Sequence, residues 1–244
     1  MQLDIGRSVT YPFEDPRWAS KLIVFLIVGF IPGLNVLVWG GYALSVARNL
    51  MRGTVYPLPA WDAWSAVAVR GLLSLVGTAL YFSPALMVLC CMLVASWLIG
   101  GRAEATFAAL RCVGIGLGIA YILTISYLLG GAHMRFAQTD QFHAYLDIGG
   151  RFQDMRDTPG VFGMLLVYQG LLTFVIGLLT VVAALLFLVA LSLIATAGDL
   201  LGIGMLFLLA VGLLGYVAFV TVAFLASGYI LGMAGRAVVQ RVGH

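Results

Sequence analysis

The sequence predicts an all-α, polytopic membrane protein, and three observations support that class. Hydrophobic residues make up 62% of the 244 residues and charged residues only 9%, whereas soluble domains carry about 25% charged residues. The mean hydropathy is +1.07, so the apolar side chains need a bilayer around them. The apolar runs continue over roughly 20 residues or more, as membrane helices require, and do not alternate over about 10 residues as barrel strands do.

The chain is expected to form one integral membrane domain over residues 1–244. No polar stretch exceeds about 30 residues, and a separate soluble domain usually needs more than 50. We expect about five hydrophobic helices, of which the first is either a span or a re-entrant hairpin. Two interfacial amphipathic segments, here called the first and second belts, are expected between them. The helices are expected at about 16–47, 71–98, 107–132, 159–197 and 200–237, the first belt at 48–70 and the second at 133–158.

The first apolar run, Leu22 to Ala47, contains the sequence IPGLN at residues 31–35. Proline removes a helix hydrogen bond and glycine loosens the backbone, so a kink or a reversal is expected there. One alternative is a single kinked helix of about 26 residues, which rises roughly 39 Å and can span a bilayer. The other is a pair of limbs of about 10 residues each that enters the membrane and returns. Asp15 and Pro16 are expected to start the first helix as its N-cap and first residue.

The first belt has the composition of a helix that lies flat among the lipid headgroups. Pro59 is expected to open a short helix, with Asp62 in its first turn, where the helix dipole favours an acid. Trp61 and Trp64 are three residues apart and so share a face of that helix. Pro57 lies in the same belt as a further interfacial candidate.

The distribution of Lys and Arg between the two membrane faces predicts the orientation. With five full spans, eight basic residues lie on the face of the belts and five on the other. If the first run is a hairpin, the three N-terminal residues change face and the count becomes eleven against two. Both alternatives place the belts and the C-terminus in the cytoplasm, with the chain in the inner (plasma) membrane. The eight are Arg48, Arg52, Arg70, Arg135, Arg151, Arg156, Arg236 and Arg241, and the five are Arg7, Arg17, Lys21, Arg102 and Arg111.

Two glycine pairs have the spacing of close helix packing. Gly114 and Gly118 lie near the start of the third expected helix, and Gly228 and Gly232 form a G-x-x-x-G face near the end of the last. Small residues at this spacing let another helix backbone approach closely. The alternative is that these glycines are simply tolerated, because glycine is frequent in membrane helices.

No catalytic, cofactor-binding or metal-ligating residue is predicted. Charged residues lie at the ends of the apolar runs, and the centres hold Asn35, Gln169 and scattered Ser and Thr. Ionisable residues at membrane depth usually mark proton or ion pathways, so such a pathway is not expected. The three histidines form no zinc motif. The net charge of +3 indicates membrane topology and no nucleic-acid partner.

The order of several motifs resembles a known family. The chain reads DIGRSVTYPFEDPRW, then an apolar run with IPGLN and GGY, then VARNLMRG and LPAWDAW. This order is similar to the prokaryotic integral membrane proteins of the domain-of-unknown-function family numbered four thousand and thirteen, most clearly over residues 4–71. That family commonly has an acid where this chain has Ala60, and the resemblance implies no catalytic residue. The shared features that it implies are Tyr11, Pro12, Phe13, Asp15, Pro32, Gly41, Tyr42, Leu58, Pro59, Ala60, Trp61 and Asp62.

The expected function is that of a non-enzymatic accessory protein that organises membrane partners or lipids. Two aromatic, basic belts on one face, glycine packing surfaces and the lack of buried charge in the sequence favour it. The alternative is a transporter or export component for a lipid or apolar solute, since proline- and glycine-broken helices line binding sites in transporters. The expected partners are the lipid bilayer and other membrane proteins or further copies of the chain.

Overall fold

The structure is a computed structural model that describes residues 5–31, 33–99, 104–196 and 199–242. These residues form helices joined by turns, and they include no strand. Three short 3-10 helices are η1 (Tyr11–Glu14), η2 (Trp61–Ala63) and η3 (Phe142–Tyr145). The α-helices are α1 (Ile5–Thr10), α2 (Trp18–Gly29), α3 (Leu34–Met51), α4 (Trp64–Ile99), α5 (Glu104–Thr139), α6 (Ile148–Asp157), α7 (Pro159–Thr196) and α8 (Asp199–Val242).

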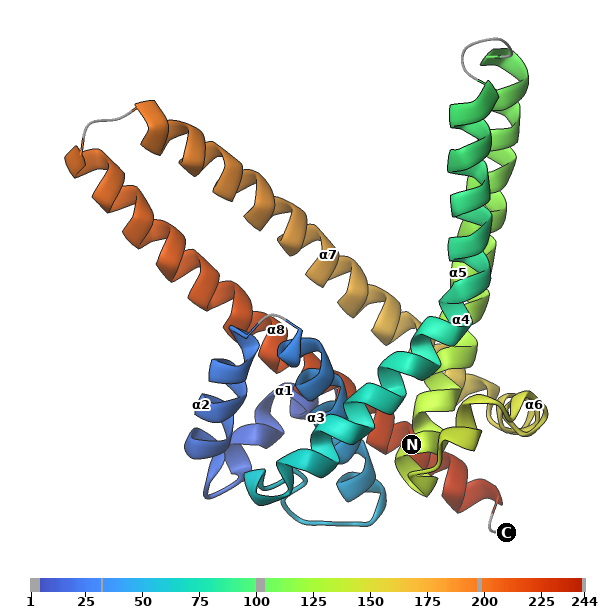
Figure 1. Ribbon diagram of the computed structural model, residues 1–244. Helices are drawn as coiled ribbons and strands as arrows, with labels where there is room; N and C mark the ends of the chain where they lie inside the picture. Colours follow the sequence, from blue (N-terminus) through green and yellow to red (C-terminus); the bar gives the residue numbers. More distant parts are fainter. Residues whose placement is uncertain (1–4, 32, 100–103, 197–198, 243–244) are drawn as a thin grey trace.

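Two antiparallel helix pairs diverge from a common base (Figure 1). We call α4 with α5 the first arm and α7 with α8 the second arm. The base contains α1, α2, α3 and α6 together with the ends of the arm helices nearest to them. Each arm helix contains a stretch that is long and apolar enough to cross a membrane, which gives four such helices among the described residues. The predicted all-α, polytopic membrane fold is confirmed.

The prediction of one helix over 16–47 is wrong, because the chain breaks between α2 and α3. Gly33 has a φ of +82°, a conformation that glycine adopts without strain. The side-chain amide of Asn35 donates to the carbonyl of Gly29 at 3.3 Å and so bridges the break. Phe25 lies against Tyr42 and Gly29 lies against Trp39, so the two limbs run antiparallel. The structure therefore has the two-limbed form.

The start of that first helix also differs from the prediction. Helix α2 begins at Trp18, and Pro16 precedes it. The carboxylate of Asp15 accepts the backbone N–H of Arg17 at 2.8 Å, which holds the turn before the helix. The first helix is therefore shorter than predicted, because the chain turns at Asp15 to Arg17 before the helix begins. Pro32 lies outside the described residues.

Both belts are shorter than predicted, because the flanking helices continue into them. Helix α3 continues to Met51 and α4 begins at Trp64, and α5 continues to Thr139. The first belt thus retains an irregular segment at 52–60 followed by η2, and the second retains η3 and α6. Arg48 and Arg135, which were predicted to lie in the belts, are part of helices α3 and α5. Both form ion pairs inside the base.

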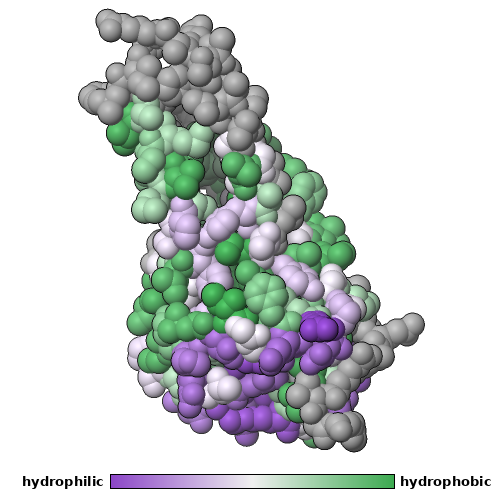
Figure 2. Space-filling view, turned by 90° about the vertical axis from the view of Figure 1, so that its right-hand side faces the viewer, coloured by the Kyte–Doolittle hydropathy of each residue, from purple (hydrophilic) through white to green (hydrophobic). Residues whose placement is uncertain are grey.

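The N-terminal basic residues lie at the same end of the molecule as the belts. The ammonium group of Lys21 donates to the carbonyl of Leu58 at 2.8 Å, and the indole of Trp61 donates to the carbonyl of Lys21 at 3.0 Å. Figure 2 shows hydrophilic residues gathered at the base, with hydrophobic residues above them. The hairpin alternative predicted this arrangement, in which the N-terminal basic residues share one face with the belts.

Glycines let α3 approach both arms at backbone contact. A Cβ on Gly71 of α4 would lie 1.7 Å from the carbonyl oxygen of Leu37, and one on Gly41 of α3 would lie 1.9 Å from that of Val67. On α8, a Cβ on Gly228 would lie 2.4 Å from the carbonyl oxygen of Ala43. No side chain larger than hydrogen fits at these three positions without moving a helix.

The other predicted packing glycines differ in their surroundings. A Cβ on Gly232 of α8 would lie 2.9 Å from the carbonyl oxygen of Ala47 on α3. Gly114 on α5 faces the flexible side chain of Met92 on α4, and Gly118 has open space where its Cβ would be. The glycines that bring helix backbones together are therefore those that face α3.

Cysteine labelling tests the shared face of the N-terminal segment and the first belt. With Cys90, Cys91 and Cys112 replaced by alanine, we expect R17C and V55C to react with a membrane-impermeant thiol reagent from the same side of the membrane. Both side chains are exposed in the base. Reaction of the two cysteines from opposite sides would show that residues 22–47 cross the bilayer.

Substitution of Gly71 tests the contact between α3 and α4. We expect G71A to lower the free energy of unfolding by about 2 kcal/mol or more, because its Cβ meets a rigid backbone. This corresponds to a thermal unfolding temperature lower by several degrees in a mild detergent. The matched control is G118A, which has open space and should be neutral or slightly stabilising. Equal unfolding temperatures for the two variants would contradict the observed helix contact.

Candidate functional site

Two of the predicted motif residues, Tyr42 and Trp61, form an aromatic cluster with Phe25 in the base. Phe25 on α2 lies 4.6 Å from Tyr42 on α3, and Tyr42 stacks on Trp61 at 5.1 Å, both between ring centroids. The hydroxyl of the buried Tyr42 donates to the carbonyl of Pro59 at 3.1 Å. These contacts fasten the α2–α3 hairpin to the segment that leads into the first arm.

Tyr11 fastens the N-terminal segment to the second arm. Its side chain is 2% exposed, and its ring stacks on that of Tyr229 on α8 at 4.7 Å. Its hydroxyl donates to the carbonyl of Leu225 on the same helix at 3.2 Å. Pro12 next to it is also buried. The tyrosine therefore serves packing and carries no exposed reactive group.

Polar contacts complete this part of the base. The carboxylate of the buried Asp15 accepts the ammonium group of Lys21 at 2.7 Å. The same ammonium group donates to the carbonyl of Leu58, the residue before Pro59, whose carbonyl accepts from Tyr42. Asn49 on α3 donates to the carbonyl of the buried Pro57 at 3.0 Å. The irregular segment of the first belt is thus held through its backbone carbonyls.

Three predicted interfacial residues remain on the surface of the base. Phe13 is 51% exposed and Trp64 is 59% exposed. The carboxylate of Asp62, which is also exposed, accepts the backbone N–H of Ala63 at 3.0 Å. These side chains lie outside the packed cluster and are exposed on the surface of the base.

Asp140 joins three elements of the base. It follows α5 and has a positive φ of 62°. Its carboxylate forms a bidentate pair with the guanidinium of Arg70 on α4, at 2.8 and 3.0 Å, and a second ion pair with Arg48 on α3. The hydrogen bonds from Arg70, followed by its charge and by Arg48, lower the pKa of the Asp140 carboxyl below its usual value.

Arg135 holds the second belt against α5. Its guanidinium pairs with Asp154 on α6 at 2.6 Å and with Asp147, the N-cap of that helix. The backbone N–H of Gly150, and then the charge of Arg135, lower the pKa of the Asp147 carboxyl. Arg151 on α6 is fully buried and donates to the carbonyl of Tyr145 at 3.0 Å. The basic residues of the two belts are therefore largely used for internal structure.

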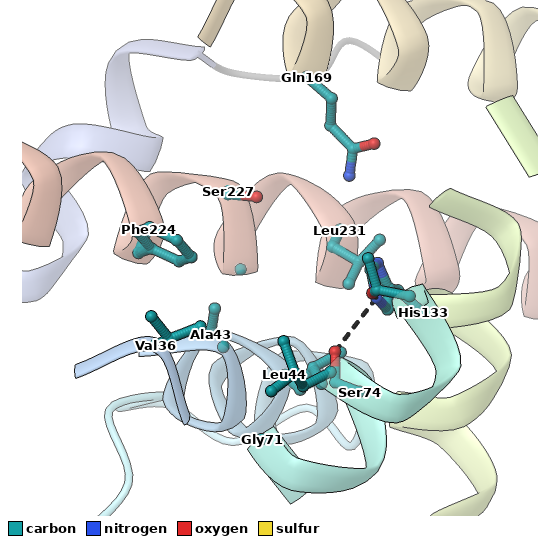
Figure 3. A pocket seen from close by; sticks show the side chains of 14 residues that line it. Val36, Ala43, Leu44, Gly71, Ser74, His133, Gln169, Phe224, Ser227 and Leu231 are labelled. Atoms are coloured by element: carbon teal, nitrogen blue, oxygen red, sulfur yellow. Dashed lines mark hydrogen bonds between the residues drawn. The ribbon is translucent and has the colours of Figure 1, made fainter. Parts of the chain in front are cut away.

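A cavity of about 250 Å³ lies beside α3, at the point where the two arms diverge (Figure 3). Apolar side chains and glycines form most of its wall. Five polar side chains from four helices also line it. They are Ser74 and Thr78 of α4, His133 of α5, Gln169 of α7 and Ser227 of α8.

The sequence did not predict this convergence of polar groups. His133 was assigned to the second belt, but it lies in α5, where its Nε2 is 3.1 Å from the hydroxyl of Ser74 and 3.4 Å from that of Thr78. The available signal was the four-residue spacing of Ser74 and Thr78, which places both hydroxyls on one face of an apolar helix. Gln169 was predicted only as a polar residue at the centre of a span.

Within the part of the chain that the structure describes, no three His, Cys, Asp or Glu side chains gather as metal ligands. The charged side chains of the base pair with one another, as Asp140 does with Arg48 and Arg70. The cavity wall instead carries hydroxyl, amide and imidazole groups. The arrangement can bind an uncharged polar group inside an apolar wall.

A family model described as a protein of unknown function, DUF4013, matches residues 23–181. The chain belongs to this family. The match begins within α2 and ends within α7, so it covers the α2–α3 hairpin, the first arm and the cavity's His133 and Gln169. Tyr11 to Asp15 precede it, and Gly228 and Gly232 follow it. The comparisons with curated proteins and with solved structures found no match.

Removing the Asp140 charge tests the ion pairs that join α3, α4 and α5. We expect D140N to lower the free energy of unfolding at pH 7 by about 1–2 kcal/mol. This is less than the ~3–5 kcal/mol of a fully buried pair, because the Asp140 side chain is 33% exposed. The matched control is D62N, whose carboxylate is exposed and should contribute little.

The pH dependence of the same variant has a defined sign. Because the folded protein lowers the Asp140 pKa, its charge stabilises the fold above the unfolded-state pKa of about 4. That stabilisation is lost as the pH falls through the lower folded-state value. The difference in unfolding temperature between wild type and D140N should therefore shrink below pH ~4. A difference that stayed constant down to pH ~2 would show that Asp140 does not act through its charge.

Proposed function

We propose that the protein is a non-enzymatic accessory protein of the cell membrane whose arms pack against the membrane helices of a partner protein. The observation that carries this proposal is the exposure of the arms. In the most apolar window of α7 none of the residues is buried, and in that of α4 only 11% are. Membrane helices usually pack on one another through close side-chain contacts. Such contacts are scarce over these arm surfaces.

One face of α7, turned away from α8, offers a regular surface to a partner. Its most exposed residues are separated alternately by four and three positions, the spacing of a coiled-coil seam. Left-handed packing at this spacing is the usual arrangement of membrane helices. The six residues are Val167, Leu171, Phe174, Leu178, Val181 and Leu185, all more than half exposed.

The length of the arm helices also favours a partner. Helix α7 has 38 residues and α4 has 36. These correspond to about 57 and 54 Å, whereas the hydrocarbon core is about 30 Å thick. Tilt accommodates part of the excess, and membrane helices tilt by about 20° on average. Packing against neighbouring helices is what normally sets such a tilt.

The base supports this role by holding both arms through α3, Tyr11 and Asp140. The bias of basic residues toward the base supports a cytoplasmic location for both belts and the C-terminus. We infer that the protein presents its arms within the inner membrane and its polar base toward the cytoplasm.

A second candidate is an export component for a lipid or apolar solute. One observation favours it, the cavity where the arms diverge. The base is closed by ion pairs beneath that cavity, so passage through the molecule would require Asp140 to release Arg48 or Arg70.

Site-specific photocrosslinking in the native host tests the proposal. A benzoylphenylalanine at Phe174 on the exposed face of α7 should give a discrete adduct with another membrane protein. The matched control is benzoylphenylalanine at Phe152 on α6. Phe152 lies in the base and is 58% exposed, against 67% for Phe174.

Native mass spectrometry of the C-terminally tagged protein should then show that partner in a fixed ratio. A chain that is alone, or a homo-oligomer that retains a lipid or small molecule, would contradict the proposal and favour export.

A further inference from the structure

The polar groups that line the cavity are not equally satisfied. His133 pairs with the hydroxyls of Ser74 and Thr78. Gln169 reaches toward the cavity from α7, as Figure 3 shows. Neither Gln169 nor Ser227 makes a side-chain hydrogen bond to another residue that the structure describes. An amide without a partner in an apolar environment is costly, so a bound group that offers hydrogen bonds would be favoured there.

The charge of the cavity restricts the kind of group that fits. Its lining contains no Asp, Glu, Lys or Arg among the described residues. The nearest guanidinium on the same helix, that of Arg70, lies one turn from Ser74 and is already paired with Asp140. An anionic headgroup would therefore enter without a counter-charge, whereas hydroxyl groups match the carboxamide of Gln169, which both donates and accepts.

The shape of the cavity indicates an amphiphile. Its volume of about 250 Å³ holds roughly eight waters at ~30 Å³ each, or a small headgroup with the first methylenes of a chain. Val36 and Leu75 line it and are both exposed, so the cavity opens toward the surrounding lipid between the arms. Its polar side chains are set among apolar ones, as Ser227 is between Phe224 and Leu231 on α8. A mostly apolar wall that carries a few neutral polar groups and opens toward lipid suits an amphiphile that enters from the adjacent leaflet.

We propose that this cavity binds the headgroup of an uncharged, hydroxyl-bearing lipid such as a diacylglycerol, with Gln169 and Ser227 as hydrogen-bonding partners. The acyl chains leave through the open side past Val36 and Leu75. The site is independent of the partner surface on α7, since that surface faces away from α8 and the cavity is lined in part by α8.

Photolabelling of the purified protein in phosphatidylcholine nanodiscs tests this site. The probe is a diacylglycerol with a diazirine in one acyl chain, and the labelled peptides are identified by mass spectrometry. We expect saturable labelling of α3, α4 or α8 near the cavity, with competition by unlabelled dioleoylglycerol and not by phosphatidic acid. Q169L should weaken binding about five- to tenfold, as expected for the loss of one neutral hydrogen bond. S227A should weaken it in the same direction.

The matched control is T173V, one turn along α7 from Gln169 and not part of the cavity wall. It should bind the probe as wild type does. The unfolding temperatures of all three variants identify any that is misfolded, in which case S227A tests the site in place of Q169L. Unsaturable labelling would show that the cavity holds water only. Equal competition by phosphatidic acid, or wild-type affinity in folded Q169L and S227A, would also overturn the proposal.

Discussion

The close approach of α3 to both arms is the constraint on which the rest of the structure depends. Gly71 and Gly41 allow α3 and α4 to touch backbone to backbone, and Gly228 does the same for α3 and α8. Within a bilayer the hydrophobic effect does not drive helices together, so such contact distances are what gives packing energy. The break after α2 leaves α3 free to sit between the arms. The angle between the two arms is set by their contacts with α3. That angle also creates the cavity between them.

The motif residues acquire a common explanation from this arrangement. Tyr42 and Trp61 fix the hairpin to the first arm, and Tyr11 fixes the N-terminal segment to the second. Asp140 then ties α3, α4 and α5 through Arg48 and Arg70. These interactions hold the arms in place, and the side chains that make them are buried or half-buried. The surfaces left for recognition are the exposed faces of the arms and the cavity between them.

Much of the fold could be predicted from sequence because a bilayer leaves few options for the backbone. The helical class followed from uninterrupted apolar runs, and the break near Gly33 followed from the local chemistry of proline and glycine. The end of a helix was harder to place. His133 follows an apolar run and resembles a surface residue, yet its partners Ser74 and Thr78 lie on another helix. The importance of Gly71 was likewise invisible, because it depends on Leu37, more than 30 residues away in the chain.

The cavity shows why the candidate site was the least predictable part. Its five polar side chains are scattered over four helices, and each alone is an ordinary polar residue of a membrane helix. Only the crossing of the helices at α3 brings them together. When each helix is considered separately, its polar residues have no visible partners. For this reason the sequence did not predict a polar site.

The central claim is that a base built around α3 holds two arms that contact each other only near the base, as Tyr127 and Phe162 do, and that the outer face of α7 stays exposed. Spin labels placed singly at Val167, Leu171, Phe174, Leu178, Val181 and Leu185 test it through their accessibility to oxygen in the purified, reconstituted protein. The account predicts high accessibility at all six positions, because this face of α7 is exposed. Low accessibility at successive positions would show that the face is buried within a single chain, and would contradict the account.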